Sequence, residues 1–243
     1  MQKHLLKEHV ELMVLEHLSR SQYAPKLAFI GGTNLRLVQG IDRFSEDLDF
    51  DIKGLTEDEF LSMTDEVVRF LQFNGMPAEV RDKNNTRLSA FRRSIYFPQW
   101  LFDLQLTGHR DERFLLKIEA QDQGKPYPVE MAHVHRNGFF FPIAVPPLGV
   151  LLSKKLTALL SRGKGRDFYD VLFLLERVQP DYSFLTLSAG ISNPTQLIAD
   201  LDALIADTDL YEKCRDFEHL LFFSGQSDKF LHFAELYKPM PRE

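Results

Sequence analysis

A segment in the first fifty residues, FIGGTNLRLVQGIDRFSEDLDFD, combines a glycine pair with a pair of carboxylates. Gly31 and Gly32 follow a short apolar strand, and their backbone can turn sharply and approach a ligand closely. The N–H groups that follow, in a short helix from Thr33 to Val38, suit a phosphate. Asp47 and Asp49 alternate with apolar residues, so a strand places both on one face, about 6.6 Å apart. Because paired carboxylates bind Mg²⁺, the segment predicts metal-dependent chemistry on a phosphate compound.

Each of these motifs also has a simpler explanation. An isolated Asp-x-Asp fits a charged strand end, and metal-dependent sugar-nucleotide glycosyltransferases use the same pattern. Gly31-Gly32-Thr33 taken alone fits an ordinary tight turn. Kinase-like, glycosyltransferase and nucleotidyltransferase chemistry are therefore all open on these residues. Their joint occurrence in one helix-strand-turn-helix-strand unit favours two motifs that face a common cleft.

A third carboxylate usually completes a two-metal site for phosphoryl transfer. Glu119 lies late in the apolar, strand-like run FLLKIEAQ and is the candidate for this role. An exposed acid on an edge strand explains Glu119 equally well. Asp51 continues the face of Asp47 and Asp49, but the neighbouring Lys53 and the approaching turn favour a solvated side chain.

A second group of candidate residues lies on two consecutive helical segments. Lys154 and Lys155 are set among the leucines of the first segment, and RGKGRDFYD then carries Asp167 and Asp170. These two acids lie on one side of the second helix, in its first turn, where the helix dipole favours acids. In a functional arrangement Lys155 contacts a triphosphate, and Asp167 hydrogen-bonds a sugar, a base or the lysine. The alternative is a solvated lysine face followed by a helix cap.

A basic, aromatic segment lies between these two groups. Clustered arginines beside aromatic rings suit phosphate contact and stacking on the end of a polynucleotide, whereas the alternative is a basic surface hairpin. His133 and His135 have no third metal ligand at suitable spacing and are expected on the surface. The basic residues are Arg81, Lys83, Arg87, Arg92 and Arg93.

The elements expected around the first motifs form a mixed sheet with helices. A loosely amphipathic N-terminal helix and an apolar strand at residues 27–30 precede the glycine turn. Thr56-Glu57-Asp58-Glu59 is a capping-box start of a helix, which Gly75 can end. Residues 78–122 are rich in branched and aromatic residues and predict further strands, LFDLQL among them. The proline-rich residues 123–147 predict a connecting loop and an edge strand.

The period becomes helical after Pro147, which indicates an α+β chain. We expect a sheet-rich core over residues 1–147 and a helical C-terminal domain over residues 148–243 that completes the active-site cleft. Asn193-Pro194 has the pattern of a helix start. The expected helices cover residues 148–161, 166–178, 194–207 and 209–223.

The composition is that of a soluble globular protein. Of 243 residues, 44% are hydrophobic and 26% charged, and the net charge of −6 argues against indiscriminate coating of nucleic acid. The single cysteine, Cys214, excludes an internal disulfide and is expected to be buried. The sequence shows neither a signal-peptide pattern nor eighteen consecutive apolar residues, so we expect a cytoplasmic protein without a membrane segment.

Both groups of motifs resemble one protein family. GGTNLRLVQGIDRFSEDLDF is similar to the first motif of the AbiEii/AbiGii-type nucleotidyltransferases, the toxins of type IV toxin–antitoxin systems. LLSKKLTALLSRGKGRDFYDVLFLL is similar to the lysine-bearing helix and the R-x-K-x-R-D-x-x-D segment of that family. The resemblance covers about residues 25–178 and implies a fold of the DNA polymerase β superfamily. Lys154 departs from the pattern, because that position is often acidic in the family.

The resemblance also implies roles for individual residues. The metal ligands would be Asp47, Asp49 and Glu119, with Mg²⁺ or Mn²⁺ as the ion. Lys155 would contact the nucleotide phosphates, and Asp167 would be an active-site acid near the nucleotide. The remaining triphosphate contacts would be Gly31, Gly32, Thr33 and, with Lys155, Arg43.

The activity implied by the resemblance is transfer of a nucleoside monophosphate from an NTP to an acceptor, such as the 3′ end of tRNA. A winged-helix antitoxin would be the cognate partner. The alternatives are a glycosyltransferase of the Asp-x-Asp type and a non-catalytic nucleotide-binding protein regulated by a partner.

Overall fold

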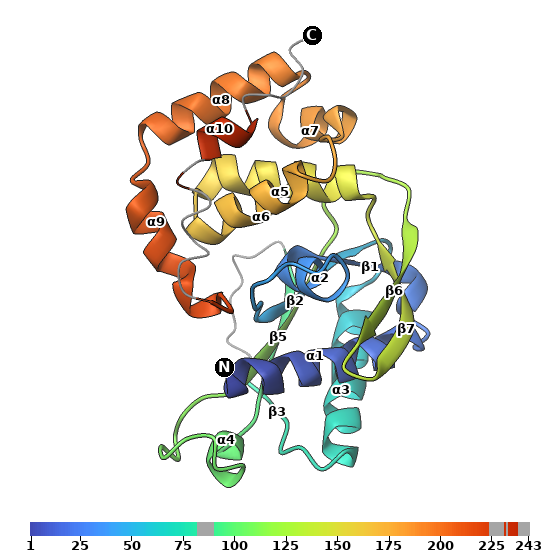
Figure 1. Cartoon of the computed structure of the whole chain (residues 1–243). Helices are drawn as coiled ribbons and strands as arrows, with labels where there is room; N and C mark the ends of the chain where they lie inside the picture. Colours follow the sequence, from blue (N-terminus) through green and yellow to red (C-terminus); the bar gives the residue numbers. More distant parts are fainter. Residues whose placement is uncertain (82–89, 224–230, 232, 238–243) are drawn as a thin grey trace. The chain divides into compact units, whose positions relative to one another are not determined.

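The computed structural model describes residues 1–81, 90–223, 231 and 233–237. The chain divides into two compact units, whose elements are labelled in Figure 1. The first unit contains Met1–Gly40, Phe44–Gly124 and Val129–Val145. The second contains Ile41–Arg43, Lys125–Pro128 and Pro146–Glu243.

A five-stranded sheet with the order β1-β2-β5-β4-β3 forms the first unit together with its helices. β2 and β5 are parallel, and every other neighbouring pair of this sheet is antiparallel. The α+β class and the mixed sheet predicted from the sequence are therefore confirmed. The strands are β1 (Leu27–Ile30), β2 (Asp47–Ile52), β3 (Glu79–Val80), β4 (Phe91–Tyr96) and β5 (Leu115–Gln121).

The helices of the first unit begin where local sequence signals place them. α1 (Gln2–Ser19) contacts α3 (Glu57–Phe73) within one hydrophobic core. The predicted capping box starts α3: Thr56 Oγ1 accepts from the Glu59 N–H at 3.2 Å, and Glu59 Oε2 accepts from the Thr56 N–H at 3.0 Å. The short helices η1 (Ala24–Lys26) and α2 (Gly31–Leu37) flank β1 along the chain.

Two segments of the first unit differ from the sequence prediction. LFDLQL was predicted as a strand, which is wrong: α4 (Trp100–Asp103) lies there, between residues with positive φ at Gln99 and Gln105. The predicted loop and edge strand is a separate two-stranded hairpin of β6 (Glu130–Arg136) and β7 (Phe139–Val145). Its two-residue turn is Asn137-Gly138, both at positive φ, which matches the twist of antiparallel strands.

Helices make up the second unit, as predicted. α5 packs against α6 and α7, and Gly163 adopts a φ of 55° where α5 ends. α7 lies in a stretch for which the sequence gave no prediction. Within the described part of the chain, no helix is long and apolar enough to cross a membrane. The helices are α5 (Leu148–Arg162), α6 (Gly165–Leu175), α7 (Tyr182–Ala189), α8 (Pro194–Ala206), α9 (Leu210–Phe217), η2 (Glu218–Leu220) and α10 (Phe233–Tyr237).

Candidate active site

The glycine turn lies directly against the acidic strand. Ile30, the last residue of β1, pairs with Asp49 in the antiparallel register. Gly31 has a φ of 81°, and a Cβ atom there would lie 2.1 Å from Asp49 Oδ2. Only glycine fits this position without displacing the Asp49 carboxylate, because both the backbone conformation and the space exclude a side chain. The turn and the second acid therefore form one compact element.

Thr33 ties the same turn to the first acid. Its buried hydroxyl donates to the backbone oxygen of Asp47 at 2.6 Å. Asn34 Nδ2 donates to the backbone oxygen of Phe29 at 2.7 Å and so holds the helix against the strand that precedes it. In this structure the Thr33 side chain positions Asp47, so a triphosphate contact at residue 33 would have to come from its backbone.

The proposed third acid stands beside the pair. Glu119 on β5 is the register partner of Asp49 on the parallel strand β2, so both side chains emerge on one face of the sheet. Neighbouring strands lie about 4.8 Å apart. Basic side chains now contact two of the acids: Arg92 Nε is 2.8 Å from Glu119 Oε1, and Lys117 Nζ is 3.4 Å from Asp47 Oδ1.

The oxygen donors on this face suit a divalent cation, although they do not form a closed cage. Asp47 Oδ1 is buried and accepts no hydrogen bond from any described residue, so the Lys117 contact is an ion pair only. Among the described residues no group of three or more His, Cys, Asp or Glu side chains is arranged to hold a metal ion. Hard oxygen donors and an unsatisfied buried oxygen fit Mg²⁺ or Mn²⁺ chemically. The expected solvation of Asp51 is wrong, because this residue is buried.

Lys155 and Asp170 form the chemical centre of the second unit. Lys155 Nζ lies 2.8 Å from Asp170 Oδ2, with both side chains largely buried. Arg43 binds the same carboxylate twice, through Nε at 2.6 Å and Nη2 at 2.7 Å. Burial alone would raise the pKa of Asp170, but the two cations outweigh burial and hold this pKa below its usual value. Asp170 is therefore a carboxylate that keeps Lys155 charged and oriented.

The sequence prediction emphasised Asp167, whereas the structure pairs the lysine with Asp170. Asp167 is fully buried and accepts two hydrogen bonds from Arg162, at 2.8 and 2.7 Å. Its Oδ2 also accepts from the backbone N–H of Lys164 at 3.3 Å, which caps the start of α6. The role of Asp170 could not be read from local spacing, because its partner Arg43 is far away in the sequence.

Arg43 differs from the freely accessible triphosphate contact that the sequence suggested. Only 1% of this residue is exposed, and its guanidinium is bound to Asp170. The neighbouring Asp42 accepts a hydrogen bond from the Tyr169 hydroxyl at 2.5 Å, and Arg43 forms an isolated β-bridge with Leu221. These contacts favour a positioning role, in which Arg43 acts on the nucleotide site through Asp170.

The basic segment does not form one continuous patch. Arg93 is buried and bonds to Thr64 and Asp65 of α3. Arg81 stacks over the ring of Tyr96 at 4.5 Å, and Arg92 faces Glu119. Lys83 and Arg87 lie outside the described residues. His133 and His135 are exposed, and Cys214 is buried, as predicted.

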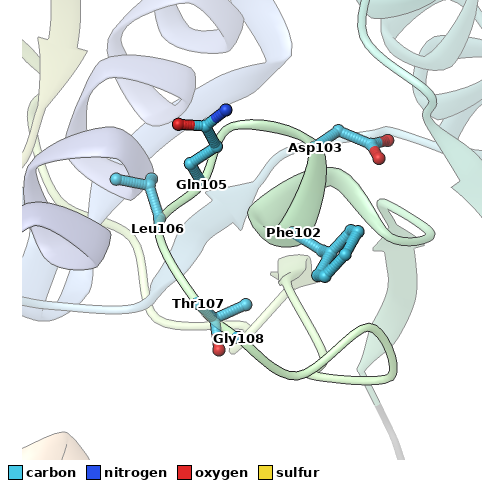
Figure 2. Close-up of a pocket in the computed structure, with 6 residues that line it drawn as sticks. All are labelled: Phe102, Asp103, Gln105, Leu106, Thr107 and Gly108. Carbon is cyan, nitrogen blue, oxygen red and sulfur yellow. The ribbon is translucent and has the colours of Figure 1, made fainter.

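A surface depression of the first unit lies apart from all of these residues. Its volume is about 570 Å³, and it is open to solvent beside the connection that follows α4 (Figure 2). None of its lining residues is a predicted site residue, and it holds one carboxylate, that of Asp103. We assign it no part in the chemistry. The lining residues are Phe102, Asp103, Gln105, Leu106, Thr107 and Gly108.

Known structures share this fold. JHP933 from Helicobacter pylori matches with a TM-score of 0.61 and 19% identity, over 98% of this chain and 91% of that one. MenT4, a nucleotidyltransferase toxin from Mycobacterium tuberculosis H37Rv, matches with a TM-score of 0.63 and 16% identity, over 97% of this chain and 82% of that one. At these identities the likeness concerns the fold alone. The comparison with curated proteins finds no match.

The sequence itself matches the family model of the nucleotidyl transferase AbiEii toxin of type IV toxin–antitoxin systems over residues 13–190. This range includes both units and every residue proposed for the site. The resemblance inferred from the two groups of motifs is confirmed, and nucleotidyltransferases of this kind use an NTP and a divalent metal ion. The chain thus belongs to the AbiEii family of nucleotidyltransferase toxins.

Proposed function

We propose that the protein transfers a nucleoside monophosphate from an NTP to an acceptor at the 3′ end of tRNA, with Mg²⁺ or Mn²⁺ held by Asp47, Asp49 and Glu119. The observation that carries this proposal is the register of Asp49 with Glu119, directly beside the Gly31 turn. When bound, the ion would neutralise phosphate charge and acidify the acceptor hydroxyl. Transfer forms a bond from the acceptor oxygen to the α-phosphorus and releases pyrophosphate.

The chain's own residues bind and orient the substrate in this proposal. The backbone N–H groups of Gly31 and Gly32 approach the phosphates, because no Cβ atom lies in the way. Lys155 supplies a positive charge to the triphosphate. Asp170 keeps the ammonium group charged and limits its rotamers, while Arg43 balances the second charge of the cluster. Asp167 supports the same helix start through Arg162.

The cellular setting belongs to the same proposal. A type IV toxin–antitoxin system implies an antitoxin, and we propose that it is a winged-helix protein encoded with this chain. We also propose that the toxin acts in the cytoplasm, where tRNA and NTPs are available. Membership in a nucleotidyltransferase family favours this chemistry over the glycosyltransferase and over a non-catalytic nucleotide-binding protein.

The test combines each α-labelled NTP with total tRNA and Mg²⁺. Wild-type protein should label the 3′ end of tRNA with one NTP, and Asp49→Asn should lose this activity. Asp58→Asn, an exposed acid at the start of α3, is the matched control and should retain it. The absence of label on any RNA, or equal labelling by Asp49→Asn, would overturn the proposal. Turnover of UDP-sugars in place of NTPs would support the glycosyltransferase alternative.

A further inference from the structure

Helix α1 carries two buried glutamates with different surroundings. Glu8 is fully matched by cations: Arg36 Nε donates to it at 2.6 Å, and Arg136 Nε donates at 2.8 Å. Glu11 is even less exposed, at 1%, but its Oε1 atom has no hydrogen-bond partner among the described residues. A buried, unpaired carboxylate is costly, so Glu11 calls for a compensating charge.

The charges nearest to Glu11 are mostly of the same sign. Burial is the main cause that raises its pKa well above the usual value. Glu8, Asp47 and Glu46 raise this pKa further, and Lys7 alone opposes them. Glu8 already has its own arginines, so the uncompensated acids are on the side of Asp47 and Glu46. The surroundings of Glu11 thus carry an excess of negative charge.

Asp47 has the same unmet need. Its Oδ1 atom is buried without a hydrogen bond from any residue that the structure describes. Asp47 and Glu11 are close enough to interact electrostatically. A single divalent cation held at Asp47 would satisfy the open oxygen of Asp47 and offset the buried charge of Glu11 together.

We propose that Glu11 is a further carboxylate of the cation site, which raises the affinity of the Asp47 and Asp49 pair for a divalent ion. The inference rests on the proposed function, since it uses the same metal site. Glu11 is a positioning residue here, because it acts on the substrate only through the bound ion and its ligands. Carboxylates that support a metal site in this way typically change metal affinity by about 10- to 100-fold.

Calorimetric titration of the full chain with Mn²⁺ alone, without nucleotide, tests the proposal. Glu11→Gln keeps the shape of the side chain and removes its charge, and we expect it to weaken Mn²⁺ binding at least tenfold. Glu16→Gln is the matched control, because Glu16 lies on the same helix and contacts the exposed Arg20. This variant should bind Mn²⁺ within twofold of wild type, although it loses the same formal charge.

Thermal unfolding gives a second readout that a purely structural role would not move. In EDTA, Glu11→Gln should unfold at the same temperature as wild type or higher, because a buried unpaired acid has been removed. The rise in Tm on adding Mn²⁺ should be smaller than in wild type. An unchanged Mn²⁺ affinity and an unchanged rise in Tm would overturn the role of Glu11.

The outcomes separate this inference from the proposed function. If Asp47→Asn and Asp49→Asn lose Mn²⁺ binding and transfer while Glu11→Gln binds Mn²⁺ like wild type, only the role of Glu11 fails. If wild-type protein does not bind Mn²⁺ and Asp47→Asn retains transfer, the metal site fails and the role of Glu11 with it.

Discussion

Lys155 and Asp170 form an ion pair of 2.8 Å between side chains that are 10% and 1% exposed. Arg43 occupies the same carboxylate, so one acid neutralises two buried cations. This arrangement means that the three residues contribute unequally to folding and to chemistry. Variants at the three positions can therefore separate the two contributions.

Replacing the shared acid should destabilise the protein strongly. Asp170→Asn leaves Arg43 and Lys155 buried without their counter-ion, and we expect a loss of about 3–5 kcal/mol in the free energy of unfolding. Urea unfolding followed by circular dichroism measures this loss. Glu176→Gln at the end of α6 is the control, because Glu176 is exposed, and it should change stability little. Equal stability of both variants would contradict the cluster.

Removing the lysine should affect chemistry more than stability. In Lys155→Met, Arg43 still neutralises Asp170, so the free energy of unfolding should fall less than in Asp170→Asn. Nucleotide transfer should fall by about 100-fold or more, because a charge on the triphosphate is lost. Steady-state kinetics at varied NTP would show the loss. Transfer at the wild-type rate would exclude Lys155 from the site.

The stability conferred by Asp170 should depend on acid pH. Because its pKa is lowered in the folded state, its contribution is fully present above the pKa of the unfolded chain, near 3.8. The contribution disappears as the pH falls through the folded-state pKa, below 3.8. The stability difference between wild type and Asp170→Asn should thus be constant near neutral pH and shrink below about pH 4. A difference that grows towards acid pH would contradict this sign.

The glycine turn provides a local test of the acid pair. Gly31→Ala adds a Cβ atom that would lie 2.1 Å from Asp49 Oδ2, and we expect transfer to fall about 100-fold because the carboxylate is displaced. Gly40→Ala has a similar φ, 80°, but its Cβ would meet no atom within 4 Å. This control should share the backbone strain and keep most of the activity. Equal activity losses would assign the effect to strain alone.

A second glycine should matter for packing in the helical unit. A Cβ atom at Gly165 would lie 1.9 Å from the backbone oxygen of Lys213, so Gly165→Ala forces α6 and α9 apart. We expect it to cost about 1–3 kcal/mol in unfolding free energy. Gly108→Ala, where the added atom meets nothing within 4 Å, should be close to neutral. Thermal unfolding of both variants decides the point.

Local signals explain which elements the sequence predicts well. The capping box at Thr56 and the alternation in DLDFDI depend on neighbouring residues only, and both occur as predicted. The hairpin of β6 and β7 also has a local signal, Asn137-Gly138, which the count of nearby prolines obscured. LFDLQL has a strand-like composition, but the positive φ at Gln99 and Gln105 excludes an extended run.

The candidate site was predictable only where strand alternation decides it. Alternation places Asp47 and Asp49 on one face, whereas the partnership of Asp49 with Glu119 depends on which strands pair. The shared carboxylate of Asp170 and the unsatisfied Glu11 depend on burial by distant segments. No spacing along the chain carries that information, so the sequence favoured Asp167 over Asp170 and passed over Glu11.

The second unit takes in Ile41–Arg43 and Lys125–Pro128 as well as the long segment from Pro146. A fragment that starts at Pro146 would therefore lack the arginine of the buried cluster, and Lys154 would lose Tyr127, one of its two aromatic contacts. During synthesis on the ribosome, Arg43 emerges long before Asp170 exists. The stretch between the glycine turn and the acidic strand must consequently wait for the C-terminal helices, so the toxin can complete its site only when nearly the whole chain has been made.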